Sequence, residues 1–277
     1  MREILEMMAA PFAASLVLTG IHTYLGLHVV ERGVIFVDLS LAQVAAFGAT
    51  IAYLCGFGFH GRPAYFFSLA FAFAAAFLFS VIRSKKTKIP QEAFIGIVYA
   101  VSAAASILVM SRAPEGGEHV KDMLVGNILV VDWEVVARTA ALYAVIGALH
   151  WFLRKPLLEI SRDPEAAARS GRKVWAWDLF FYATFGFIVT SSVSIAGVLL
   201  VFSYLIVPSV TAMLFSRNLG TRLAIGWVMG TVVSILGMVL SYRFDLPTGA
   251  TIVCSFGGVL VLAAVARQIW PSSWKSA

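Results

Sequence analysis

Nine long apolar segments dominate the sequence and decide its fold class. Each is close to the ~20 residues that an α-helix needs to cross the ~30 Å hydrocarbon core of a bilayer. Backbone groups find no water in that core, so such segments must be helical. The segments cover about residues 9–30, 33–55, 63–82, 91–111, 135–154, 178–196, 197–216, 222–241 and 249–267.

We therefore predict an all-α, polytopic membrane protein that forms one domain over residues 1–277. We expect about nine transmembrane helices, with a range of eight to nine. The pair that meets at Ala196 and Gly197 makes the count ambiguous, because one of the two is alternatively a broken or re-entrant piece.

Composition excludes a water-soluble globule, because only 13% of the residues are charged, whereas soluble domains have about 25%. The net charge of +6 does not indicate nucleic-acid binding, since the basic residues lie in short loops between apolar segments. Cys55 and Cys254 lack the spacing of a disulfide framework or a zinc site.

The basic residues also predict the orientation. Cytoplasmic loops carry an excess of Lys and Arg, and a nine-span arrangement with an outer N-terminus and a cytoplasmic C-terminus puts most of the 21 basic residues inside. The six left outside are Arg2, Arg62, Arg112, Lys121, Arg138 and Arg243.

The stretch from 154 to 178 is the longest charged connection, and we expect it to lie in water. A short helix fits its middle: Asp163 can cap it, Pro164 suits its first position and Gly171 can end it. A capped, charged helix between two membrane spans suits a docking surface for a soluble partner. The alternative is an ordinary solvated loop.

Four stretches together resemble the membrane permease subunit of bacterial ABC importers for zinc, manganese or iron. They are ERGVIFVDLSLAQVAAFGA at 31–49, QEAFIGIVYA at 91–100, the region from 163 to 219 that contains GVLLVFSYLIVPSVTAMLFSRNL, and LSYRFDLPTGATIV at 240–253. They occur in family order over most of the chain.

The resemblance implies a type II importer-like permease in the bacterial inner membrane. It implies a homodimer with two ABC ATPase subunits beneath it and an extracellular metal-binding protein above it. The chain itself has no GxxxxGK[ST] loop, so ATP would bind to the partner chain. The implied cargo is a divalent metal, with no permanently bound cofactor.

By the same resemblance, the helix near 163–171 is the coupling helix that enters a cleft on the ATPase. The residues expected to serve this ATPase coupling are Asp163, Glu165, Ala166, Arg169 and Gly171.

Asp38 is the clearest candidate for a metal ligand, because a carboxylate at membrane depth usually faces a cavity or marks a pathway. The family pattern places a histidine four residues after this aspartate, where this chain has Ala42. Gln43 follows, and His22 lies near the middle of the first span. We hypothesise a composite metal site of Asp38, Gln43 and His22. The alternatives are a helix cap or an interhelical contact, with Ser40 nearby, for Asp38, and a hydrogen bond to a neighbouring helix for His22.

Two further residues have predicted roles. Asp245, at the outer mouth, could receive the ion from the binding protein, or instead pair with Arg243 or cap the final helix. Pro208 interrupts the hydrogen bonding of its span and is a possible gate.

The sequence thus predicts a permease that moves zinc, manganese or iron inward by alternating access, driven by a separate ATPase. It does not choose among these metals. A permease of the same architecture for another small nutrient is the alternative. An intramembrane enzyme is disfavoured, because the chain has no HExxH, GxSxG or paired intramembrane carboxylates.

Overall fold

The computed structural model describes residues 2–58, 61–84, 89–111, 124, 126 and 128–269, without the side chains of 2–7 and 84. Secondary structure within these residues is helical throughout, with no strand, which confirms the predicted all-α class. The helices are α1 (Arg2–Arg32), α2 (Val37–Leu54), α3 (Arg62–Ser84), α4 (Gln91–Met110), the 3-10 turn η1 (Ile128–Val130), α6 (Trp133–Phe152), α7 (Arg154–Arg162), α8 (Pro164–Arg169), α9 (Val174–Phe215), α10 (Leu219–Phe244) and α11 (Thr248–Ile269).

Eight of the described helices are long and apolar enough to cross a membrane. One of them, α9, has 42 residues and would be ~63 Å long if straight, about twice the hydrocarbon core. It is broken at Gly197, which has φ 75° and ψ 162°, so α9 forms two arms of membrane-spanning length. The predicted boundary between Ala196 and Gly197 lies at this break.

The connection before η1 touches the bend directly. A Cβ atom on Gly126 would lie only 2.2 Å from the carbonyl carbon of Ala196 and 2.3 Å from the nitrogen of Gly197. Gly126 also has a positive φ of 63°. Only glycine allows this approach of two backbones, so the bend in α9 is supported by the segment that leads into α6.

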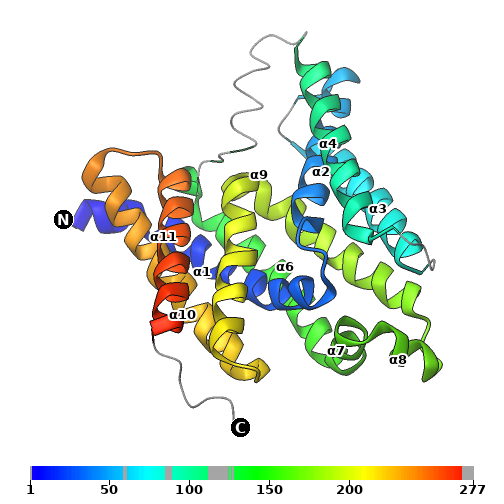
Figure 1. The fold of residues 1–277 in the computed structure, drawn as a ribbon. Helices are drawn as coiled ribbons and strands as arrows, with labels where there is room; N and C mark the ends of the chain where they lie inside the picture. The colour runs from blue at the N-terminus through cyan, green and yellow to red at the C-terminus, as the bar shows by residue number, and fades with distance from the viewer. Residues whose placement is uncertain are drawn as a thin grey trace.

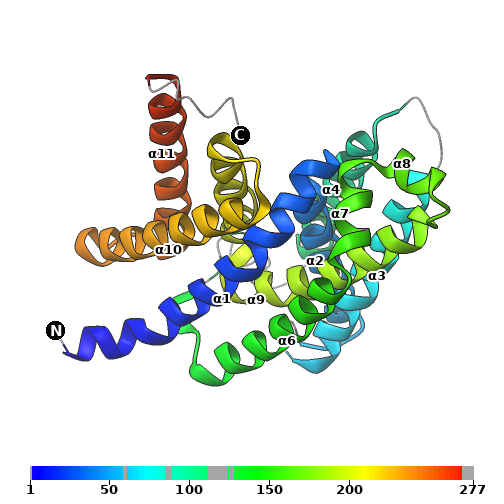
Figure 2. The same ribbon diagram turned by 90° about the horizontal axis from the view of Figure 1, so that it is seen from below.

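Helices α1 and α9 form the centre of the molecule, as Figures 1 and 2 show. Helices α2, α3 and α4 pack together on one side, whereas α10 and α11 pair on the other. The central helices approach closely at Gly26, where a Cβ atom would lie 2.0 Å from the carbonyl oxygen of Leu205. Two large side chains of α9, Phe181 and Tyr204, are fully buried in the core.

Several helix ends meet on one face, which we call the coupling face and define by α7, α8, the end of α1, the end of α3 and the start of α9. Ion pairs join these ends: Asp178 of α9 contacts Arg32 and Arg83. Glu31 of α1 contacts Arg222 of α10 at 2.7 Å, so α10 begins on the same side. The bend of α9, with Gly126 against it, lies at the other end of the α9 arms.

The stretch between α6 and α9 contains the expected short helix. In α8 the Asp163 carboxylate accepts a hydrogen bond of 2.8 Å from the Ala166 amide, Pro164 is the first residue, and Gly171 follows with φ 85°. Two features differ from expectation. Helix α7 precedes α8, and α9 begins early enough that Asp178 is fully buried and not in water.

Candidate functional site

Asp38 lies in the first turn of α2 with only 1% of its surface exposed. The residues that the structure describes offer no hydrogen-bond partner to its Oδ1 atom. It does not cap α2: the Phe36 amide at the start of that helix donates instead to Glu92 of α4, at 3.0 Å. Because a buried carboxylate without a partner is unfavourable, Asp38 is the described acid best suited to receive a cation.

Gln43 belongs to the same helix but points elsewhere. It lies five positions after Asp38, and at ~100° per residue the two side chains project about 140° apart around α2. Gln43 is also buried. The regular helix therefore does not bring these two side chains together, whereas Ala42 shares the face of Asp38.

His22 of α1 is held by neighbours on both of its ring nitrogens. Nδ1 lies 2.8 Å from the Leu18 carbonyl, which can only accept, so Nδ1 carries the proton and Nε2 keeps its lone pair. Nε2 faces the Ser192 hydroxyl of α9 at 3.2 Å. The fixed tautomer is the one that a metal-binding histidine needs.

Tyr143 of α6 extends this cluster. Its hydroxyl contacts that of Ser192 at 2.5 Å and lies 3.2 Å from the Ile188 carbonyl, and its ring is 6.2 Å from the ring of His22. A buried polar cluster therefore joins α1, α6 and α9.

No group of three or more His, Cys, Asp or Glu side chains within the described ranges could hold a metal ion. The composite site of Asp38, Gln43 and His22 has only two residues of these types, so this finding does not test it and it stays a prediction for the loaded protein. Sequence reasoning missed Tyr143 and Ser192. The signal available for them was a tyrosine and a serine inside otherwise apolar spans, which usually need a partner there.

Asp245 and Pro208 lie apart from this cluster. Asp245 is exposed and ends α10 in the left-handed conformation, with φ 52° and ψ 48°. Pro208 is buried in the second arm of α9, which stays helical through it. The break in that helix is at Gly197, eleven residues before the proline. The receiving role of Asp245 and the gating role of Pro208 stay predictions.

The residues predicted for coupling form a projecting surface at α8, visible at the edge of the molecule in Figure 2. Asp163, Glu165, Arg169 and Gly171 are exposed, and Ala166 is partly exposed. The neighbouring Ala167 is fully buried and holds α8 against the rest of the protein. This arrangement leaves one face of α8 free for a soluble partner.

Behind α8 lies a buried ion cluster that sequence reasoning missed. Asp178 Oδ1 accepts hydrogen bonds from Arg32 Nη1 at 2.6 Å and from Arg83 Nη1 at 2.7 Å. The Arg32 guanidinium also lies 4.0 Å from the centre of the Phe181 ring. A possible signal was that these charges of opposite sign stand at the ends of three different apolar segments.

Two buried histidines near this cluster are poor candidates for metal binding. His28 contacts the Ser161 hydroxyl at 2.8 Å, and His150 contacts that of Thr184 at 2.8 Å. The Arg32 guanidinium donates to the same Ser161 hydroxyl that contacts His28. A divalent cation beside them would be repelled by that charge.

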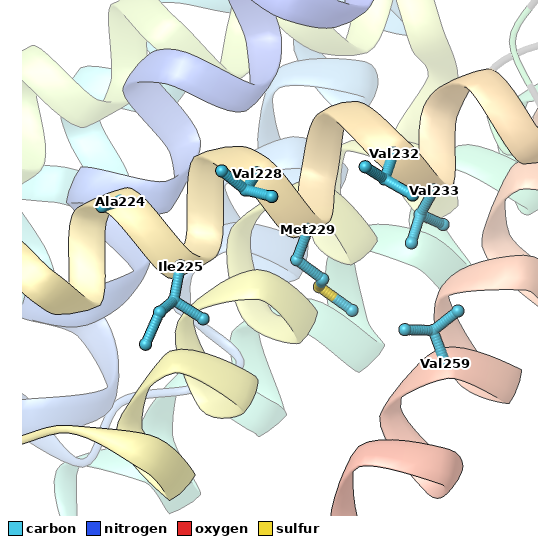
Figure 3. A pocket seen from close by; sticks show the side chains of 7 residues that line it. All are labelled: Ala224, Ile225, Val228, Met229, Val232, Val233 and Val259. Carbon is cyan, nitrogen blue, oxygen red and sulfur yellow. The ribbon is translucent and has the colours of Figure 1, made fainter.

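An open hollow of about 480 Å³ lies between α10 and α11 (Figure 3). Its lining is entirely apolar and offers a metal ion no ligand. The residues that line it are Ala224, Ile225, Val228, Met229, Val232, Val233 and Val259. This hollow therefore does not suit a cation.

Comparison with known proteins decides the family. The model of the ABC 3 transport family matches residues 4–267. This chain belongs to the ABC 3 transport family. The chain is accordingly a transport permease without catalytic activity of its own, and the expected fold, family and role as a transporter subunit are confirmed.

Relatives in the family are named for metal transport. A "Probable iron transport system membrane protein" of Haemophilus influenzae is 24% identical over 264 residues, covering 95% of each chain. The manganese transport system membrane protein MntC of Listeria monocytogenes is 27% identical over 229 residues, covering 83% of this chain and 79% of its own.

Solved structures share the fold. PsaBC from Streptococcus pneumoniae in complex with Fab matches with a TM-score of 0.76 and 21% identity, over 93% of this chain and 90% of that one. This likeness supports the arrangement of helices described above for an ABC 3 permease.

Proposed function

We propose that this ABC 3 permease moves a divalent transition metal ion, manganese, iron or zinc, into the bacterial cytoplasm by alternating access. The observation that carries the proposal is the buried Asp38 carboxyl group, which has no hydrogen-bond partner for Oδ1 in the described part of the chain. Carboxylate and imidazole ligands suit hard to borderline divalent ions.

The route that we propose passes between α1, α2, α6 and α9. Asp38 supplies the charge that attracts the ion, and His22 supplies an Nε2 lone pair after Ser192 turns away. Loading would bring these groups together, because a ligand shifts an equilibrium towards the state that it binds better. The names of relatives, which mention iron and manganese, support the class of cargo.

Energy for transport comes, in this proposal, from an ABC ATPase on a separate chain. The exposed face of α8 supports a docking role, and Asp163 keeps that helix ordered. We further propose a homodimer of the permease in the inner membrane, an outer N-terminus, a cytoplasmic C-terminus and an extracellular metal-binding protein. Under this orientation the coupling face is cytoplasmic, and Asp245 lies at the outer mouth.

Uptake by the reconstituted complex tests the proposal. The permease, its ATPase and its binding protein would be placed in proteoliposomes, and Mn²⁺, Fe²⁺ and Zn²⁺ accumulation would be measured with and without ATP. We expect ATP-dependent accumulation of at least one metal. ATP hydrolysis without accumulation of any of the three would contradict the proposal and favour the alternative, a permease for another small nutrient.

A further inference from the structure

The buried ion cluster has two cations, Arg32 and Arg83, but only one anion, Asp178. Arg32 and Arg83 donate to the same oxygen of Asp178, at 2.6 Å and 2.7 Å. The second oxygen, Oδ2, has no partner among the described residues. Because apolar residues of similar volume often stabilise a fold as well as a buried ion pair does, this cluster is a poor device for stability alone.

The same two arginines hold the last turn of α7. Arg32 Nε donates to the Ser161 hydroxyl at 2.9 Å, and Arg83 Nη2 donates to the Ile160 carbonyl at 3.3 Å. Helix α7 ends at Arg162, one residue before the cap of α8. The two arginines that bind Asp178 therefore also set the position of α7 relative to α1 and α3.

Helices α7 and α8 are joined to each other as well. Glu159 of α7 contacts Arg172 at 2.7 Å and accepts a hydrogen bond of 3.2 Å from Ser170, and both partners follow α8. Glu31 of α1 contacts Arg162 at 3.6 Å. A displacement of α8 must therefore move α7 and strain its contacts with the arginines.

The two arginines differ in how easily they can leave. The Arg32 side chain is fully buried and stacked on Phe181, whereas 10% of the Arg83 side chain is exposed. Water can solvate Arg83 at lower cost when it departs. Its departure leaves Arg32 and Asp178 as a neutral pair.

We propose that Asp178 is a positioning residue for transport, which holds Arg83 in the conformation described here and releases it when the ATPase moves α8. The proposal rests on the proposed function. The Arg32–Asp178 pair persists in both states, and α3 changes its place relative to α7 when Arg83 leaves. Because α3 packs on α2, the exchange connects the coupling face to the helix that carries Asp38.

Arg83→Gln tests this proposal, because it removes the surplus cation and keeps the neutral pair. Spin labels at two exposed positions, Leu78 of α3 and Lys155 of α7, would report the distance between these helices. The exposed cysteines Cys55 and Cys254 would first be replaced by serine. In the wild-type complex we expect the distance to change by a few ångströms when ATP is trapped.

In the Arg83→Gln complex we expect the nucleotide-free distance to match that of the ATP-trapped wild type. Metal uptake per ATP should fall ~10-fold, within the usual range of coupling energies, while the variant still assembles and hydrolyses ATP. Arg83→Lys keeps the ion pair and should restore most of both readouts. If Arg83 had only a structural role, Arg83→Gln would change neither the nucleotide dependence of the distance nor the uptake per ATP.

The proposal is overturned if Arg83→Gln shows the wild-type distances in both nucleotide states, or if its uptake per ATP stays within about twofold of the wild type. The matched control is Arg138→Gln, which removes an exposed arginine from the Arg138–Glu134 pair of α6 and should change nothing. Absence of metal uptake in the wild type would refute the proposed function. The distance measurement would still show whether Arg83 leaves Asp178 when ATP is trapped.

Discussion

Two buried aspartates show how differently this chain treats a carboxylate inside its helical bundle. Asp178 is fully buried and accepts hydrogen bonds from two arginines, whereas Asp38 is 1% exposed and forms no ion pair with any described residue. The charge of Asp178 is neutralised by the protein. Asp38 has no such counter-charge among the described residues, which is what the proposed cargo site would require.

The largest expected effect concerns Asp178. Asp178→Asn leaves two guanidinium groups buried without a counter-charge, so we expect the free energy of unfolding to fall by ~3–5 kcal/mol. Thermal unfolding in detergent measures this change. Arg83→Gln keeps the pair with Arg32 and should have a much smaller effect. If the free energy of unfolding fell equally in the two variants, the distinction between a neutral Arg32–Asp178 pair and a surplus Arg83 cation would be wrong.

Asp38 should behave in the opposite way. Asp38→Asn removes a charge that has no protein partner, so the protein should fold at least as well as the wild type. Metal uptake should fall at least ~100-fold, since even groups that only support a ligand change affinity by ~10–100-fold. Glu134→Gln, an exposed carboxylate of α6, is the control. Normal metal uptake by the Asp38→Asn variant would show that Asp38 is not part of the transport pathway.

His22 sharpens the comparison, because its Nε2 atom contacts Ser192 in this conformation and is proposed to bind the cation on loading. His22→Gln should lower metal affinity ~10-fold, as measured by calorimetry on the purified permease. Gln43→Ala tests the third member of the composite site and should have the smaller effect, because Gln43 projects ~140° away from Asp38 on α2. A larger loss in Gln43→Ala than in His22→Gln would show that α2 rearranges on loading.

The smallest effect is expected at the cap of α8. Asp163→Ala removes a hydrogen bond to the Ala166 amide and should cost ~1 kcal/mol of helix stability, which corresponds to a ~5-fold weaker affinity for the ATPase. Asp132 caps α6 in the same way, through the Val135 amide. Asp132→Ala is therefore the control and should leave ATPase affinity unchanged.

Local signals in the sequence were enough for much of the fold. The apolar segments gave the membrane helices to within a few residues. Asp163, Pro164 and Gly171 predicted α8, because capping depends on neighbours in the chain. The break at Gly197 was expected as a boundary between Ala196 and Gly197, because the apolar run of α9 is too long for one crossing.

Long-range contacts could not be predicted in this way. Asp178 is 146 residues from Arg32 and 95 from Arg83, so no pattern near Asp178 revealed its burial. Helix α7 was missed for a similar reason, since its stability comes from packing Leu157 and Ile160 and not from capping. The divergence of Asp38 and Gln43, in contrast, follows from helical periodicity and was available from the sequence.

Anomalous diffraction from crystals of the Mn²⁺-loaded permease tests the central claim most directly. If Asp38 receives the cargo, an anomalous peak at the manganese edge should lie about 2.0–2.6 Å from its carboxylate oxygens. The peak should vanish in Asp38→Asn. A peak bound by other residues, unchanged in Asp38→Asn, would contradict the account.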